Sequence, residues 1–260
     1  RKIMKQSKGI LALVLALTML LGISATGLAE EARPALLVVS FGTSYNETRD
    51  ATIGAIEQAL AAAYPEYEVR RAFTAQIVID ILAEREGLEI DNVTQAMERL
   101  VADGVKEVVL QPTHIMNGYE YEDILAEVAP YRDSFDRFTI GDPLLISDED
   151  FTRVAAAIAE GTADYNNEGT AIALMGHGTE HEANSVYVRL QQAFIGAGYD
   201  NYFIGTVEAE PGLDEVLEAV RASGASKVVL LPMMVVAGDH ASNDMAGDDE
   251  DSWKSGFEAA

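Results

Sequence analysis

Residues 35–41 read ALLVVSF, and this short apolar stretch is the first indication of the fold. Its aliphatic and β-branched side chains predict a buried strand, and the sequence GTS directly after it predicts a turn. Helical periodicity follows over residues 47–64 and ends at Pro65. A second strand is predicted at residues 68–74, so the chain begins as a strand, a helix and a strand.

Strands and helices keep alternating along the rest of the chain. We expect further strands, the last two with the loops that follow them, at residues 105–112, 137–145, 170–178, 201–211 and 227–240. We expect helices at residues 76–86, 91–104, 121–135, 151–165, 186–198 and 213–224. This alternation predicts an α/β fold with doubly wound parallel sheets, in which ligands bind at the carboxyl ends of the strands.

Two internal similarities indicate a duplication. The sequence VVSFGT resembles ALMGHGT and places Phe41 opposite His177. The sequence VKEVVLQPTHIMNGYE resembles SKVVLLPMMVVAGDH and places Glu120 opposite His240. We therefore expect two similar α/β lobes that face a central cleft, with the join near residues 147–149.

The first 29 residues predict a separate segment. They contain four basic residues and no acid, and the apolar run ILALVLALTMLLGIS leads to the small residues GLA. This order is typical of a secretory signal peptide that is cleaved near Ala29. The alternative is an uncleaved membrane anchor, for which the apolar run is short. We divide the chain into a signal peptide (1–29), an N-terminal lobe (30–147) and a C-terminal lobe (148–260). A periplasmic or otherwise exported protein, with no stable membrane span after processing, is expected.

Composition limits the partners of this chain. After the leader it contains 14 Lys and Arg against 43 Asp and Glu, and such an acidic body repels nucleic acid. The absence of cysteine excludes disulfides and thiolate metal sites. The chain stops at DSWKSGFEAA, which indicates a helix capped by Asp251 or Ser252 with no strand behind it. We therefore expect the C-terminal lobe to be truncated.

Two histidines follow predicted strands in the C-terminal half. His177 lies between two glycines, which allow a sharp turn, and His240 comes shortly after Gly238. Imidazole is a common ligand of divalent first-row metals, and Glu208 can reach the same edge of the sheet. The matching place in the first half holds Glu120, whose carboxylate can complete a metal shell or accept protons. The alternative for each residue is an ordinary loop side chain.

Further groups fit a binding role. The sequence SFGT offers backbone N–H groups and hydroxyls to an anion, and it lacks the glycine patterns of nucleotide-binding loops, so no nucleotide is expected. Arg70 and Arg71 are candidate carboxylate clamps. His114 is expected to line the cleft or to make a structural hydrogen bond, and His181 to lie behind the metal ligands or in solvent. The candidate substrate-binding residues are Ser40, Phe41, Gly42, Thr43, Arg71 and His114.

A resemblance to a known family adds to this interpretation. The stretches LLVVSFGTSYNET, HIMNGYEYEDI, GDPLL, MGHGTEH, TVEAEP and PMMVVAGDHASNDMAGDDEDSWK together resemble the anaerobic sirohydrochlorin cobaltochelatases of the CbiK type. The resemblance implies a two-lobed chelatase fold that inserts a divalent ion into a tetrapyrrole without ATP. It also implies that His177 and His240 hold the metal together with Glu208. Glu120 matches a cleft acid near the substrate.

We therefore expect an exported tetrapyrrole chelatase that inserts Co²⁺ or Fe²⁺ into sirohydrochlorin. His177, Glu208 and His240 hold the ion, and an acid or a histidine accepts the pyrrole protons, so that Glu120, His177 and His240 are the catalytic candidates. One alternative is a periplasmic metal- or tetrapyrrole-binding protein for uptake or storage, which the leader favours. Another is a sugar- or anion-binding pair of lobes. The sequence leaves open the physiological metal, the tetrapyrrole and association into a homo-oligomer.

Overall fold

The computed structural model describes residues 32–236 and 238–260, and the predicted signal peptide therefore lies outside the described residues. Residues from Arg33 to Ala260 form one compact unit. No helix in the described part of the chain combines the length and the apolar character that a membrane crossing needs.

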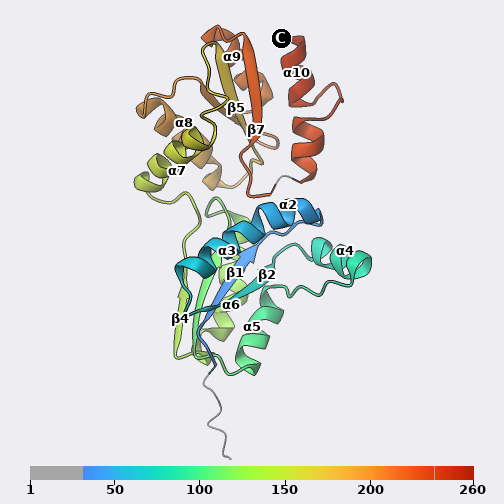
Figure 1. Cartoon of the computed structure of the whole chain (residues 1–260), viewed down its shortest axis with the longest axis vertical. Helices are drawn as coiled ribbons and strands as arrows, with labels where there is room; N and C mark the ends of the chain where they lie inside the picture. The colour runs from blue at the N-terminus through green and yellow to red at the C-terminus, as the bar shows by residue number, and fades with distance from the viewer. Residues whose placement is uncertain (1–31, 237) are drawn as a thin grey trace, which may run out of the picture. The chain divides into compact units, whose positions relative to one another are not determined.

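The first sheet has four parallel strands (Figure 1). They are β1 (Ala35–Ser40), β2 (Glu68–Phe73), β3 (Glu107–Pro112) and β4 (Arg137–Ile140). Their order across the sheet is β2-β1-β3-β4, and the pairing aligns Ala35 with Glu68 on one side and with Val108 on the other. Every residue of β1 is buried, which confirms the buried strand predicted from ALLVVSF. β4 ends earlier than predicted, because the backbone N–H of Leu144 donates to the carbonyl of His114 in the loop after β3 instead of continuing a strand.

The helices of the first half follow the predicted pattern with two differences. They are α2 (Asn46–Ala51), α3 (Ile53–Ala63), α4 (Gln76–Glu86), α5 (Val93–Ala102), α6 (Tyr119–Val128) and the 3₁₀ helix η1 (Ala129–Ser134). The single helix predicted at 47–64 breaks at Thr52, whose hydroxyl donates to the carbonyl of Thr48 at 2.7 Å. The helix predicted at 121–135 tightens into a 3₁₀ turn from Ala129 onward, where Pro130 supplies no N–H. Asn92 caps α5, and its side chain accepts from the backbone N–H of Gln95.

The second sheet repeats the arrangement of the first. Its parallel strands are β5 (Thr170–Gly176), β6 (Tyr202–Thr206) and β7 (Lys227–Pro232). The order β6-β5-β7 matches β2-β1-β3, so the central strand of each sheet is the first along its half of the chain. This agrees with the duplication inferred from sequence. Within the described residues β7 has no strand on its outer edge, whereas β3 pairs with β4.

Helices cover both faces of the second sheet. They are α7 (Asp148–Gly161), the 3₁₀ helix η2 (Glu182–Asn184), α8 (Ser185–Gly196), α9 (Leu213–Ser223), the π-helical turn η3 (Ala241–Met245) and α10 (Trp253–Ala259). Ile172 and Leu174 of β5 pack in one cluster with α7 and α8, and the alternate residues Ala173 and Met175 pack with α9 and α10. This alternation confirms the doubly wound α/β fold. Ser252 caps α10 and accepts from the N–H of Ser255.

Loops that follow the strands of each half pack against the other half. Ile115 and Met116, which follow β3, pack against the cluster beneath α7 and α8. In the reverse direction Val236, which follows β7, packs against a cluster of the first half that contains Ile53 and Phe73. Because these contacts come from loops at the carboxyl ends of strands, they hold in place the loops that carry the candidate site.

Candidate functional site

His177 follows β5 at a tight backbone turn. Gly178 has a φ of +88°, and a side chain there would put its Cβ 2.8 Å from the backbone nitrogen of Ala209. Gly176 lies against the ring of Tyr187, which leaves no room for a Cβ. The two glycines therefore place the imidazole at the edge of the sheet, as the sequence predicted. Burial raises the pKa of Tyr187, so this ring stays a neutral support under the turn.

The tautomer of His177 follows from its hydrogen bond. Nδ1 lies 2.8 Å from the carbonyl oxygen of Gly178. A carbonyl only accepts, so Nδ1 carries the proton and Nε2 keeps a free lone pair. The side chain is about half-exposed, and this lone pair is open to a ligand.

Glu208 is held beside His177 by backbone hydrogen bonds. Its N–H donates to the carbonyl of His177 at 2.8 Å, and the N–H of Val207 donates to the carbonyl of Gly176 at 3.0 Å. The loop after β6 is thus tied to the loop after β5, because neighbouring parallel strands end at the same edge. A carboxylate oxygen of Glu208 lies 3.8 Å from Nδ1 of His177.

His240 lies in the segment that follows β7, the third strand of the sheet. It precedes η3, and its Nδ1 lies 2.7 Å from a carboxylate oxygen of Asp244. A carboxylate that holds one imidazole nitrogen orients the ring and leaves the other nitrogen for a metal. Asp244 was not among the residues predicted from sequence to serve the site. Its spacing of four residues from His240 was the available signal, since residues i and i+4 share one face of a helical turn.

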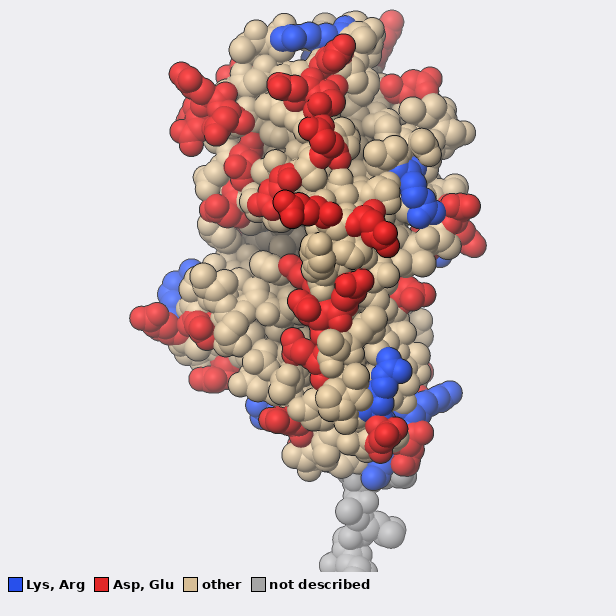
Figure 2. Space-filling model, turned by 180° about the vertical axis from the view of Figure 1, so that it is seen from behind, with Lys and Arg blue, Asp and Glu red and all other residues tan. Residues whose placement is uncertain are grey.

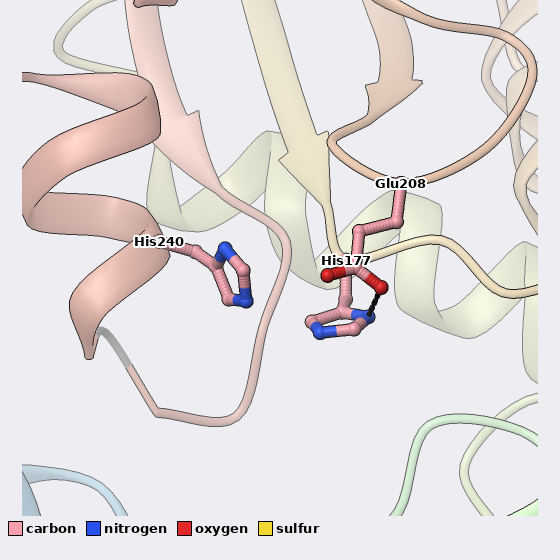
Figure 3. A group of neighbouring side chains, drawn as sticks. All are labelled: His177, Glu208 and His240. Atoms are coloured by element: carbon pink, nitrogen blue, oxygen red, sulfur yellow. Dashed lines mark ion pairs between the residues drawn. The ribbon is translucent and has the colours of Figure 1, made fainter.

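These three side chains converge (Figure 3). One ligand atom from each of His177, Glu208 and His240 lies within 4.8 Å of the other two. The two imidazole rings stand edge to face with centroids 4.7 Å apart and an angle of 89° between their planes. Two neutral imidazoles and one carboxylate form an N,N,O set that suits divalent first-row metals such as Co²⁺ and Fe²⁺.

The predicted binding residues after β1 lie in different environments. Phe41 is exposed, whereas Ser40 and Thr43 are buried. The hydroxyl of Thr113 donates to that of Ser40 at 2.9 Å, and the backbone N–H of Tyr45 donates to the hydroxyl of Thr43 at 3.2 Å. These hydroxyls are therefore engaged inside the protein.

Gly42 follows Phe41 with a φ of +101°, and it covers the ring of Phe73. This turn directs the backbone away from the end of β1 in a conformation that favours glycine. Gly42 therefore shapes the loop through its backbone, and it has no side chain with which to contact a ligand.

Arg70 and Arg71 are both committed to acids of the first half. Arg71 donates to both carboxylate oxygens of Glu57 at 2.7 and 2.5 Å, and this hydrogen bonding raises the pKa of Arg71. Arg70 pairs with Glu68 and Asp103. A guanidinium held in this way has few donors left, so the geometry gives no support to Arg70 or Arg71 as a clamp for substrate.

The other two histidines each lie beside a glutamate of α6. Nε2 of His114 lies 3.0 Å from Glu120, and Nε2 of His181 lies 3.4 Å from Glu122. His181 is the N-cap of η2, and it is not part of the metal-binding group found among the described residues.

Acidic side chains dominate the face shown in Figure 2, with few Lys and Arg between them. Such a surface attracts cations in general, but it does not select a position for one. The specific position comes from the convergence of His177, Glu208 and His240.

Comparison with known proteins identifies the family to which this chain belongs. Residues 34–260 match the family described as cobalt chelatase (CbiK). The chain is 42% identical over 228 residues to the sirohydrochlorin cobaltochelatase of Salmonella typhimurium. The match covers 88% of this chain and 86% of that protein. It is 34% identical over 227 residues to the sirohydrochlorin cobaltochelatase CbiKC of Nitratidesulfovibrio vulgaris, covering 86% of this chain and 79% of that protein. The chain belongs to the cobalt chelatase family and is a metal chelatase.

Proposed function

We propose that this chain inserts Co²⁺ into sirohydrochlorin without a nucleotide, and that His177, Glu208 and His240 hold the ion as it enters. The convergence of these three side chains from the ends of three strands is the observation that carries the proposal. Both related enzymes are named as sirohydrochlorin cobaltochelatases. The same ligand set suits Fe²⁺, which we propose as a second metal substrate.

The chemistry of insertion favours a site of this kind. The protein must hold the ion firmly enough to position it, yet loosely enough that pyrrole nitrogens replace the protein ligands. Three ligands leave open coordination positions, and imidazole and carboxylate exchange more readily than thiolate, which this chain lacks. Holding ion and macrocycle together turns a bimolecular encounter into a local exchange.

The end of β1 is the proposed contact for the macrocycle. The exposed ring of Phe41 offers a flat apolar surface, and the backbone N–H groups of Gly42 and Thr43 can face a substrate carboxylate. Ser40 supports this loop through its hydrogen bond with Thr113.

The direct test supplies sirohydrochlorin and Co²⁺ and follows the absorption change of the macrocycle. We expect turnover by the wild-type protein and almost none by the His177→Ala/His240→Ala double variant. An unchanged insertion rate in that variant would show that the proposed site is wrong. Tight binding of metal and tetrapyrrole without turnover would favour a protein of uptake or storage.

We further propose that the chain is exported and cleaved near Ala29, because its first residues have the order of a signal peptide. N-terminal sequencing of protein recovered from the periplasm is expected to begin at Glu30. Recovery of the intact leader on protein in the cytoplasm would contradict export.

A further inference from the structure

A cavity of about 300 Å³ is lined by residues from both halves of the chain, and none of the three proposed metal ligands lines it. From the first half come Asn117, which follows β3, and Leu145 and Ile146, which follow β4. The second half contributes residues between His181 and Arg189, in the segment that contains η2 and the start of α8. The cavity is large enough for a small organic group.

Part of the lining is apolar and rigid. Leu145 and Val186 are buried and belong to the cluster beneath α7 and α8. The backbone N–H of Leu145 donates to the carbonyl of Ile115 at 2.8 Å, which fixes this wall to the loop after β3. Such a surface suits the methylene groups of a ligand.

Arg189 brings a positive charge to the cavity. Its guanidinium lies over the ring of buried Phe151, 4.0 Å from the ring centroid, and this stacking holds the planar group in place. Nη2 donates to Asp148 at 2.9 Å, whereas Nε and Nη1 make no hydrogen bond within the described residues. The side chain of Asp148 is fully exposed, so this ion pair is weak and can be exchanged for another carboxylate.

The arginines discussed above are bound differently. Arg71 donates to both carboxylate oxygens of Glu57, and Arg70 pairs with two acids. Arg189 instead keeps donors in the fork geometry that matches a carboxylate. Of these three arginines, Arg189 is therefore the one that can accept an anionic ligand.

Two neutral polar side chains lie on the same wall. Ser185 and Arg189 are four residues apart on α8, so they share one face of the helix. The hydroxyl of Ser185 and the amide of Asn117 belong to exposed residues and can donate to a carboxylate oxygen. Glu182 also lines the cavity, but it is exposed, and water and salt screen its charge.

The cavity shares a loop with the metal-binding group. His181 lies four residues after His177, so the Cα atoms of the two residues are at most about 14 Å apart. The backbone N–H of Thr179 donates to the side-chain oxygen of Asn184 at 3.0 Å, which holds the loop between them. In a tetrapyrrole the metal lies at the centre of the ring and the side chains lie on its rim. A contact for a side chain is therefore expected beside the metal ligands and not among them.

We infer that this cavity receives one carboxylate side chain of the tetrapyrrole, with Arg189 as its charged anchor, an inference that rests on the proposed function for the identity of the ligand. Sirohydrochlorin carries acetate and propionate side chains around its ring. The guanidinium exchanges Asp148 for the substrate carboxylate, Ser185 and Asn117 donate to its oxygens, and the methylene groups lie against Leu145 and Val186.

The anchor has two consequences for substrate choice. The chain after its leader has 14 Lys and Arg against 43 Asp and Glu, and such a body repels an anionic substrate unless a cation meets it locally. A macrocycle with a methyl or vinyl group at that position leaves Arg189 paired with Asp148 and gains no ion pair. The cavity therefore selects carboxylated macrocycles, and it fixes how the ring is rotated over the metal-binding group.

The test compares Arg189→Gln with a matched control. We expect Arg189→Gln to raise KM for sirohydrochlorin, and Kd for the metal-free macrocycle, about tenfold or more, with kcat and Co²⁺ affinity little changed. Arg132→Gln is the control, because Arg132 is also exposed and lies over an aromatic ring, Phe138, but does not line the cavity. It should keep the wild-type KM, and thermal unfolding of both variants should match that of the wild type.

A second variant tests the cavity itself. Ser185→Phe puts a ring into the space that the side chain of the substrate would occupy, and Arg189 keeps its charge. We expect a similar rise in KM and Kd, again with little change in Co²⁺ affinity. Ser185 is exposed, so the protein is expected to fold with this substitution.

The outcomes separate this inference from the proposed function. Wild-type turnover with KM within twofold of normal in both Arg189→Gln and Ser185→Phe overturns the inference alone. Equal rises in Arg189→Gln and Arg132→Gln also overturn it, because overall charge then explains the effect. A wild-type protein that binds the macrocycle without turnover, and binds it tenfold more weakly as Arg189→Gln, overturns the proposed function and supports the inference. No binding of the macrocycle overturns both.

Discussion

His177 and His240 share one arrangement at the scale of single residues. In each, Nδ1 is held by an oxygen acceptor, from Gly178 in one case and from Asp244 in the other. This leaves Nε2 as the nitrogen available to an ion and restricts the rotation of both rings. The acceptors differ in charge, so their contributions to metal affinity are expected to differ as well.

Replacing Asp244 tests this arrangement. We expect Asp244→Ala to weaken Co²⁺ binding by about 10- to 100-fold, because the ring of His240 loses its orientation and part of its basicity. Isothermal titration calorimetry measures the change. Asp239→Ala is the control, since Asp239 lies on the same loop, carries the same charge and accepts a hydrogen bond from the side chain of Asn243. Equal losses in the two variants would show that charge, and not orientation, is what matters.

The glycine after His177 is a second test at this scale. We expect Gly178→Ala to lower the free energy of unfolding by about 1–2 kcal/mol, because an alanine is strained at a φ of +88°, and to weaken Co²⁺ binding. Gly196→Ala, in a helix with open space around the new methyl group, should be neutral or slightly stabilising. Urea unfolding of both variants measures the difference. Unchanged stability and metal binding in Gly178→Ala would refute the role given to the turn.

At the scale of elements, the site depends on loops that cross between the halves. His240 lies four residues after Val236, and Val236 packs on the cluster of the first half that contains Ile53 and Phe73. The position of one metal ligand is therefore set partly by packing against the other sheet.

Replacing Val236 tests this coupling. We expect Val236→Asp to cost about 1–3 kcal/mol of stability, since a charged group enters an apolar contact, and to weaken Co²⁺ binding although Val236 cannot bind the ion. Val188→Asp, at an exposed position of α8, should change neither quantity. Thermal unfolding and Co²⁺ titration of the two variants give the comparison. Wild-type metal affinity in Val236→Asp would show that the loop holds His240 without this contact.

At the scale of the whole molecule, a bound ion is expected to stabilise the folded chain. Its three ligands come from segments far apart in sequence, so only the folded state brings them together. Binding of Co²⁺ at 100 times its Kd should add about 2.7 kcal/mol to the free energy of unfolding. Thermal unfolding with and without Co²⁺, repeated after addition of a chelator, measures this. The His177→Ala/His240→Ala variant should show no such shift, and an equal shift in that variant would place the ion elsewhere.

The order of strands and helices was predictable because it depends on local patterns. Apolar runs such as ALLVVSF and the cap at Asn92 report on the backbone of their own segment. The break at Thr52 was not predicted, since periodicity alone continues through it. The ion pair between Arg71 and Glu57 could not be predicted either, because the two residues lie on different elements and no sequence pattern pairs them. This ion pair is why the structure gives no support to Arg71 as a clamp for a substrate carboxylate.

The α/β class and the two similar halves could be predicted from the sequence, and so could the three residues proposed as metal ligands, because turn residues and an internal duplication are visible in short stretches of chain. The tertiary structure was needed to show that Asp244 orients His240, that Arg71 is paired with Glu57, and that Nδ1 of His181 accepts from the backbone N–H of Ala183. These properties depend on which donor lies within about 3 Å of which acceptor. Packing between distant segments sets such distances, and they cannot be predicted from the spacing of residues along the chain.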